Sequence, residues 1–408
     1  MNAIRLLSVC VLLLASPVIA GDWPQILGPH RNGVAEDERI VDELPARPKA
    51  LWTRTVGDGL AGVAVVDGTV YLFHRADEKE RIEAMSARYG EVLWTSDSPT
   101  TYSGAIASDS GPRCVPVVAG GHVILFGAQG RLRCLERSTG NEVWSTSTHE
   151  VFGAQEGYFG AGSSPIVEGG LVLVNVGAFR SDAGIVAFDL KSGEVRWKVT
   201  DEQPGYSSPI SATVGGRRQI VFVTRYNCLG IEPATGKTLW SLPFGSRGPT
   251  VNGANPVLVG SDRLFLTSSY GVGAAFAKLT ADGATEIWRD DLMSSQYTTP
   301  IEHEGVLFGI DGRQDVGVAT LRCLDPAAKK VLWDEENFGY ATLIKADGKL
   351  LVQKTDGTLV LVKPDMTGYR ELSKATLTNG TARALPALSD GLYFIRDEST
   401  LSCYDLSP

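Results

Sequence analysis

Short runs of β-branched and aromatic residues alternate with tight turns from residue 50 to the end of the chain. Such small or polar pairs between β-rich runs are typical of hairpins, because the turn requires a positive φ. The pattern predicts eight β-hairpins and an all-β fold. The eight turns are Asp67-Gly68, Gly120-Gly121, Gly169-Gly170, Gly215-Gly216, Ser261-Asp262, Glu304-Gly305, Asp347-Gly348 and Asp390-Gly391.

Tryptophans recur at intervals of 42 to 53 residues, which is the length range of propeller blades. In most units the ten residues before the tryptophan share a frame with Thr-Gly or Ser-Gly at its centre, as in Cys134–Trp144. This tryptophan frame predicts a second hairpin, so that each unit has four antiparallel strands, A to D, with the tryptophan on D. We expect the tryptophans to pack neighbouring blades together rather than to bind a ligand. The seven are Trp52, Trp94, Trp144, Trp197, Trp240, Trp288 and Trp333. Trp23 lies outside this frame and is a candidate for pinning the N-terminal segment against the propeller.

The two ends of the repeat region complement each other. The last unit, residues 385–406, supplies strands A, B and C, whereas residues 50–56 around Trp52 supply a D strand with no partner before it. Joining them completes an eighth blade and removes open sheet edges. We therefore expect an eight-bladed β-propeller over residues 50–408, closed by the N-terminal strand around Trp52, with an extension over residues 21–49.

The repeat resembles that of the quinoprotein, or pyrroloquinoline-quinone-like, β-propeller family, as in Ala187-Phe-Asp-Leu-Lys-Ser-Gly-Glu-Val-Arg-Trp197. The resemblance covers residues 50–408. The opening Asp22-Trp23-Pro24-Gln25, with Gly28-Pro29 and Gly33-Val34, resembles the start of secreted members from planctomycete-like bacteria. Long members of the family are dehydrogenases that bind the quinone and calcium. Members of about this length resemble BamB, a scaffold of outer-membrane assembly without enzyme activity.

The resemblance to the dehydrogenases implies a quinone stacked on a disulfide of adjacent cysteines, beside a calcium ion held by Asp, Asn and Glu. No two cysteines are adjacent here, and no such ligand set can be assigned. Three cysteines fill a strand-C position where Ala84, Ala187 and Ala277 stand in other units, so we expect buried free thiols. The cysteines after residue 20 are Cys114, Cys134, Cys228, Cys323 and Cys403.

Five histidines are scattered over different units without the spacing of a metal site: His30, His74, His122, His149 and His303. No nucleophile with an adjacent base can be assigned either. The sequence therefore predicts no cofactor, no metal site and no catalytic residue; pyrroloquinoline quinone and calcium belong only to the alternative of a dehydrogenase.

The first twenty residues have the composition of a secretory signal peptide. Arg5 precedes an apolar run over residues 6–14 that is too short to span a bilayer, and small residues end at Ala20. We expect cleavage before Gly21 and a periplasmic or extracellular protein with no membrane span in the mature chain. A retained anchor is the alternative, and lipid attachment at Cys10 is disfavoured because Val9 stands where a small residue is required.

The formal net charge of −9 argues against a nucleic-acid partner, which would need a basic stripe. We expect a monomer that binds an envelope or secreted protein.

One face of the propeller is expected to carry the binding surface. The A–B and C–D turns are short and uniform, whereas the connections on the opposite face vary in length. The variable B–C loops are residues 75–81, 180–184 and 312–317, and the longest D–A loops are residues 96–113, 145–162 and 241–254. Variable loops on a rigid scaffold commonly bind ligands. The predicted surface consists of Tyr102, Phe152, Tyr158, Phe159, Arg180, Arg225 and Arg313, with Arg75, Arg131 and Arg396 also expected at the channel mouth.

The resulting hypothesis is an exported propeller that binds or scaffolds a protein partner and has no identifiable catalytic site. The alternatives are a quinone-dependent oxidoreductase and a sugar- or peptide-binding accessory protein. For the loop residues, the alternative is that the aromatic rings cap the propeller edge and the arginines are simply solvated.

Overall fold

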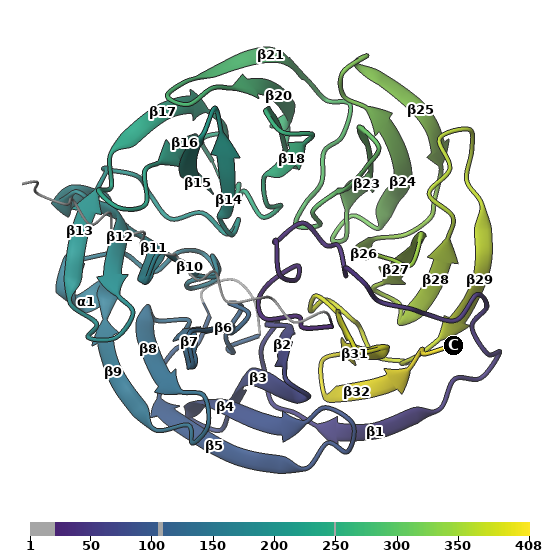
Figure 1. Ribbon diagram of the computed structural model, residues 1–408, viewed down its shortest axis with the longest axis horizontal. Coiled ribbons are helices and arrows are strands. Elements are labelled where there is room, and N and C mark those ends of the chain that lie inside the picture. Colours follow the sequence, from purple (N-terminus) through teal and green to yellow (C-terminus); the bar gives the residue numbers. More distant parts are fainter. Residues whose placement is uncertain (1–20, 105–108, 249) are drawn as a thin grey trace, which may run out of the picture.

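The computed structural model describes residues 21–104, 109–248 and 250–408. The predicted signal peptide, its cleavage position and Cys10 therefore fall outside the described residues. Eight four-stranded antiparallel sheets surround a central channel (Figure 1). The predicted eight-bladed β-propeller is confirmed.

The blades are numbered in chain order from the first sheet that is continuous in sequence. Blade 1 is β2 (Val63–Val66), β3 (Thr69–Ala76), β4 (Lys79–Ser86) and β5 (Val92–Pro99). Blade 2 is β6 (Val117–Ala119), β7 (His122–Phe126), β8 (Arg131–Glu136) and β9 (Glu142–Ser147). Blade 3 is β10 (Ile166–Glu168), β11 (Leu171–Ala178), β12 (Ala183–Asp189) and β13 (Val195–Val199). Blade 4 is β14 (Ile210–Val214), β15 (Arg217–Val223), β16 (Asn227–Ile231) and β17 (Thr238–Pro243).

Blade 5 is β18 (Val257–Val259), β19 (Arg263–Ser268), β20 (Gly273–Leu279) and β21 (Ala284–Asp290). Blade 6 is β22 (Ile301–His303), β23 (Val306–Arg313), β24 (Val318–Asp325) and β25 (Lys330–Glu335). Blade 7 is β26 (Ala341–Ala346), β27 (Lys349–Lys354), β28 (Thr358–Val362) and β29 (Glu371–Thr376). Blade 8 is β30 (Ala387–Ser389), β31 (Leu392–Arg396), β32 (Thr400–Asp405) and β1 (Ala50–Thr55). A short helix α1 (Thr148–Phe152) follows β9, and a 3-10 turn (Phe179–Ser181) precedes β12.

Blade 8 is assembled from both ends of the described chain. β1 pairs antiparallel with β32, and Trp52 lies opposite Cys403. Figure 1 shows β1 alongside β32 at the outer edge of the ring. The D strand of this blade thus comes from residues 50–55.

The tryptophans join each blade to the next, as the repeat predicts. Their indole N–H groups donate to backbone carbonyls in the C–D turn of the following blade at 2.8 to 3.0 Å. The rings also lie against glycines of those turns, where an added Cβ would come within 2.4 to 2.7 Å of the ring at Gly90, Gly140, Gly193 and Gly236. Trp240 differs, because its indole N–H donates to Gln219 Oε1 within its own blade at 2.6 Å.

One position of the tryptophan frame is corrected by the register. Trp288 lies opposite Phe276 rather than the expected Ala277, because the C–D turn of blade 5 holds two more residues than the same turn in blades 1 to 4 and 6. Cys134, Cys323 and Cys403 do lie opposite the tryptophans of their own sheets. All five described cysteines are buried and unpaired.

Residues 21–38, here called the channel segment, lie near the centre of the ring (Figure 1). Trp23 is buried, as the sequence suggested, and exchanges two backbone hydrogen bonds with Val65 of β2 at 2.7 and 2.8 Å. Arg31 reaches the carbonyl of Pro209 before β14 at 2.9 Å. Lys345 of β26 bonds to the backbone of Gly33 and Ala35 at 2.8 and 2.9 Å. The segment therefore contacts blades on opposite sides of the ring.

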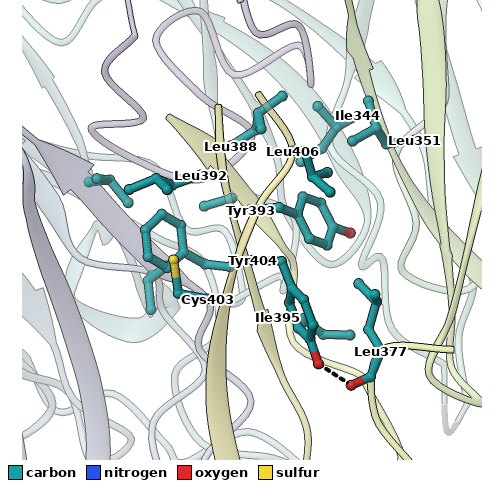
Figure 2. Packing of buried hydrophobic residues seen from close by; sticks show 14 of the residues in the cluster. Ile344, Leu351, Leu377, Leu388, Leu392, Tyr393, Ile395, Cys403, Tyr404 and Leu406 are labelled. Atoms are coloured by element: carbon teal, nitrogen blue, oxygen red, sulfur yellow. Dashed lines mark hydrogen bonds between the residues drawn. The ribbon is translucent and has the colours of Figure 1, made fainter. Parts of the chain in front are cut away.

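The apolar core fills the spaces between the sheets. Figure 2 shows one such layer, in which Tyr393 lies among apolar side chains of blades 7 and 8 and the Tyr404 hydroxyl donates to the Leu377 carbonyl. In the part of the chain that the structure describes, no helix has the length and apolar character needed to cross a membrane.

Candidate functional site

The structure divides the seven predicted surface residues into three groups. Tyr158, Phe159 and Arg225 come together on the face of the B–C and D–A loops. Arg313 lines a separate groove between blades 5 and 6. The other three, Tyr102, Phe152 and Arg180, lie in neither the cluster nor the groove.

Two aromatic residues predicted to be exposed serve the core instead. Tyr102 is only 3% exposed, and its carbonyl accepts a hydrogen bond from the Arg75 guanidinium. Phe152 ends helix α1 and is half-buried, with its ring 6.2 Å from that of Phe188. Their burial agrees better with the alternative, in which the aromatic rings cap the propeller edge, than with an exposed contact surface.

The arginines do not form a ring around the channel mouth. Arg396 is buried and donates to the carbonyls of Gly57 and Ala61 at 2.8 and 2.9 Å, and burial lowers its pKa to about 10. Arg131 is 3.9 Å from Glu142 within blade 2. Arg180 is exposed, with its guanidinium 5.3 Å from the ring centre of Phe179.

The B–C connection of blade 1 is shorter than the sequence suggested. The region predicted as a loop, residues 75–81, is mostly strand, since β3 extends to Ala76 and β4 begins at Lys79. Arg75 and Arg81 therefore lie within a long hairpin. In contrast, the loop predicted over residues 145–162 is a long connection, which contains α1 and begins after β9 ends at Ser147.

The aromatic–arginine cluster consists of Arg113, Tyr158, Phe159, Tyr206, Arg225 and Tyr226. The Arg113 guanidinium lies 5.5 Å from the Phe159 ring centre, and the Phe159 and Tyr206 rings are 5.7 Å apart. The Arg225 guanidinium lies 5.2 Å from the Tyr158 ring centre and 5.5 Å from that of Tyr226. Three D–A connections and one B–C turn thus contribute to one surface.

Arg225 differs electrostatically from Arg113. Arg113 is 3.5 Å from Asp109, whereas no carboxylate of the described residues lies within ion-pair distance of Arg225. Arg225 donates through Nε to the Tyr226 hydroxyl at 3.0 Å and through Nη2 to the Gly248 carbonyl at 2.7 Å. Its half-buried guanidinium is oriented by neutral groups, and its charge stays available to an incoming anion.

Tyr206 fixes the position of Phe159. The Phe159 N–H donates to the Tyr206 hydroxyl at 2.8 Å, and burial raises the pKa of that hydroxyl to about 12, so it stays protonated. A Cβ at Gly162 would lie 2.3 Å from the Tyr206 ring, which explains a glycine there. Both rings are half-buried, but Phe159 is held in place by Tyr206, whereas Tyr158 lies beside Arg225.

A series of hydrogen bonds holds the bases of the D–A loops around the channel. The N–H of Ser164 donates to Ser208 Oγ at 2.9 Å, that of Ser208 to Asn255 Oδ1 at 2.7 Å, and that of Asn255 to Thr299 Oγ1 at 3.0 Å. Each of these residues directly precedes a proline that leads into strand A. The recurring polar residue before proline was a sequence signal for this series that the sequence analysis missed.

The groove near Arg313 has a volume of about 700 Å3 and is lined by Tyr270, Arg313, Val316 and Val318, among others. The Arg313 guanidinium lies 4.4 Å from the Tyr270 ring centre and forms an ion pair with Asp315. Val316 and Val318 are 57% and 61% exposed. The arginine of this groove is thus already neutralised by a carboxylate, unlike Arg225.

The described residues do not fit a quinone and calcium. Over residues 21–104, 109–248 and 250–408, no three His, Cys, Asp or Glu side chains lie close enough to hold a metal ion. The cysteines are buried apart from one another, so they cannot supply the adjacent pair on which the resemblance places the quinone. No reaction step through such a group is derived.

A family model described as "Outer membrane protein assembly factor BamB" matches residues 78–335, which is more than half of the chain. The chain belongs to the BamB family. The predicted membership of the pyrroloquinoline-quinone-like propeller repeat group is thereby confirmed, while the resemblance of residues 22–34 to secreted planctomycete members stays a prediction.

Both BamB proteins and quinoprotein dehydrogenases are similar to this BamB-family chain. BamB of Burkholderia pseudomallei is 24% identical over 378 residues, covering 78% of this chain and 83% of that protein. The crystal structure of BamB from Moraxella catarrhalis has a TM-score of 0.62 at 12% identity, over 88% of this chain and 97% of that one. Quinohemoprotein alcohol dehydrogenase from Comamonas testosteroni has a TM-score of 0.67 at 15% identity, over 95% and 80%. The two structures share the fold with this chain.

Proposed function

We propose that this propeller is a protein-binding accessory module of the cell envelope and that the aromatic–arginine cluster is its docking site. The observation that carries the proposal is the guanidinium of Arg225, which lies beside Tyr158 and Tyr226 without a neutralising carboxylate among the described residues. Tyrosine and arginine dominate the energetics of protein interfaces, and arginine binds carboxylates with two parallel hydrogen bonds. The partner should present a carboxylate flanked by apolar surface.

The relatives support the same class of function. Proteins named as outer membrane protein assembly factors match over most of this chain and of their own length. We propose that this chain likewise acts outside the cytoplasm, after removal of residues 1–20, as a monomer and without a cofactor. Similarity to alcohol dehydrogenases keeps a quinone-dependent oxidoreductase as an alternative, and a sugar- or peptide-binding accessory role as another, but no described side-chain set supports either.

The docking site is tested by capturing the partner from the envelope fraction with the mature protein and then measuring its affinity for single variants. Arg225→Ala should weaken binding at least tenfold, because the interfacial carboxylate loses its partner. Arg180→Ala is the matched control, since Arg180 is also stacked on an aromatic ring of a B–C connection.

The proposal requires that Arg180→Ala bind like the parent and that Arg225→Lys recover only part of the affinity, because a lysine offers no planar fork. Equal binding by the parent and Arg225→Ala, with both folded, would place the partner elsewhere on the propeller.

A further inference from the structure

A pocket on the A–B turn side of the propeller encloses the beginning of the channel segment. It has a volume of about 260 Å3 and is lined by Gly21, Asp37, Glu38, Arg39, Asp390, Gly391, Ser407 and Pro408. This pocket lies on the opposite face from the aromatic–arginine cluster, because its walls include the A–B turn of blade 8.

Gly21 lies directly against the Asp390 carboxylate. A Cβ added at Gly21 would stand 2.1 Å from Asp390 Oδ1, and its φ of +99° also favours glycine. The main chain at Gly21 therefore approaches this carboxylate so closely that no residue with a side chain would fit at this position. Gly21 is also the residue directly after the signal-peptide cleavage position that we expect from the sequence.

The pocket has an excess of negative charge. Glu38 accepts the N–H groups of Asp390 and Gly391, both at 2.7 Å, and Asp22 accepts the N–H of Asp67 at 3.0 Å. Burial raises the pKa of Asp22 and of Glu38, and the charge of Asp390 adds to the rise of both.

The nearby cations are engaged with other carboxylates. Arg137 pairs with Asp67 at 2.6 Å, Arg39 with Asp347 at 3.8 Å and Arg88 with Asp405 at 3.4 Å. Among the described residues, Asp22, Glu38 and Asp390 are in no ion pair. The charges that act on Asp22 are those of Asp67, Asp390 and Arg137, which come from blades 1, 8 and 2.

We infer that cleavage before Gly21 creates an α-ammonium group that pairs with Asp390 and fixes the start of the channel segment. Water hydrolyses the peptide bond between Ala20 and Gly21: the carbonyl carbon takes the hydroxyl and the nitrogen takes the hydrogen, which gives a carboxylic acid and an amine. At neutral pH the acid releases its proton and the amine binds one, so that a carboxylate leaves with the leader and an ammonium group stays on Gly21. The nitrogen of an uncleaved chain stays a neutral amide. Removal of the leader thus adds a cation beside Asp390, which is in no ion pair among the described residues, and makes the mature fold more stable than the precursor.

The inference is tested with a cleavable fusion whose protease leaves Gly21 as the first residue, compared with the same chain carrying Ser-Ala before Gly21. At pH 7 the chain that begins at Gly21 should unfold in urea about threefold more slowly, the magnitude of a partly exposed ion pair. At pH 10 the ammonium has lost its proton and the difference should vanish, because its stabilisation exists only in the charged form. High salt should reduce it as well.

Asp390→Asn in both chains provides the matched control and should abolish the difference at pH 7. The inference is wrong if the two chains unfold at equal rates at pH 7, or if a difference persists in Asp390→Asn or at pH 10. It is also wrong if N-terminal sequencing of the exported protein finds a first residue other than Gly21. These variants lie on the opposite face from the docking site and should leave partner binding unchanged. A negative result here would therefore not count against the proposed docking site, and a negative result there would not count against this inference.

Discussion

Side chains of the same type play different roles on the loop face, and their neighbours decide which. Arg113 and Arg225 both stack on aromatic rings, but Asp109 neutralises the first and no described carboxylate neutralises the second. Tyr158 and Phe159 are adjacent in sequence, yet Phe159 is held by Tyr206. The sequence indicated that this long loop holds aromatic residues. It could not indicate which ring packs against other loops and which is available to a partner, because that depends on neighbours that are distant in the sequence.

This difference predicts opposite behaviour for two adjacent substitutions. Tyr158→Ala should weaken the partner about tenfold and leave the melting temperature nearly unchanged, since the ring contacts Arg225 at the surface. Phe159→Ala should instead destabilise the fold by about 1 kcal/mol, because it removes an aromatic pair and the stacking of Arg113. Calorimetry of the free proteins and titration of the partner separate the two effects. A large loss of stability in Tyr158→Ala would show that this ring also supports the loops.

At the scale of the strand, the tryptophan frame was a strong signal because the ring meets a glycine of the next C–D turn at four blade junctions, at Gly90, Gly140, Gly193 and Gly236. Lengths of the hairpins were less predictable. β3 and β4 extend into residues predicted as a loop, because their cross-strand pairs stabilise a hairpin that the composition does not distinguish from a polar loop. The residue opposite Trp288 was predicted to be Ala277 but is Phe276, because sequence spacing does not reveal how a turn accommodates inserted residues.

The strand that contains Trp52 should be essential to blade 8. Trp52→Ala should destabilise the protein by about 3 kcal/mol, at the lower end for such a change because the ring is only half-buried. Deleting residues 50–56 should lower the melting temperature sharply. Leu51→Ala is the control on the same strand, as Leu51 is 43% exposed. If Trp52→Ala and the deletion both melt like the parent, β1 does not contribute to closure.

At the scale of the whole molecule, the channel segment was largely unforeseen. Trp23 stood outside the tryptophan frame and was suspected of pinning the N-terminal stretch, but nothing periodic marks residues 24–38 as the filling of a channel. The guanidinium of Arg31 lies there among neutral oxygens, including those of Gln25, Pro165 and Pro209, and burial lowers its pKa to about 9. A single side chain thereby links the segment to blades 3 and 4.

Arg31→Ala should therefore destabilise the whole propeller by about 2 kcal/mol, because it leaves buried carbonyls of two blades without a donor. His30→Ala, at the exposed neighbouring position, should cost little. Equilibrium urea unfolding, followed by tryptophan fluorescence and by circular dichroism, measures both. An Arg31→Ala protein as stable as the parent would mean that the channel segment adheres through its backbone alone.

The pairing of β1 with β32 also has a kinetic consequence. Seven blades are built from neighbouring hairpins, but the eighth sheet joins residues 50–55 to residues 400–405, which is nearly the largest sequence separation that the chain allows. Contacts of such separation slow folding, because the entropy of closing the loop is lost before the contact is gained. A chain emerging N-terminus first holds an unpaired strand until its last residues have been made. The ring is thus completed late, and this seam is where we expect a finished molecule to open first.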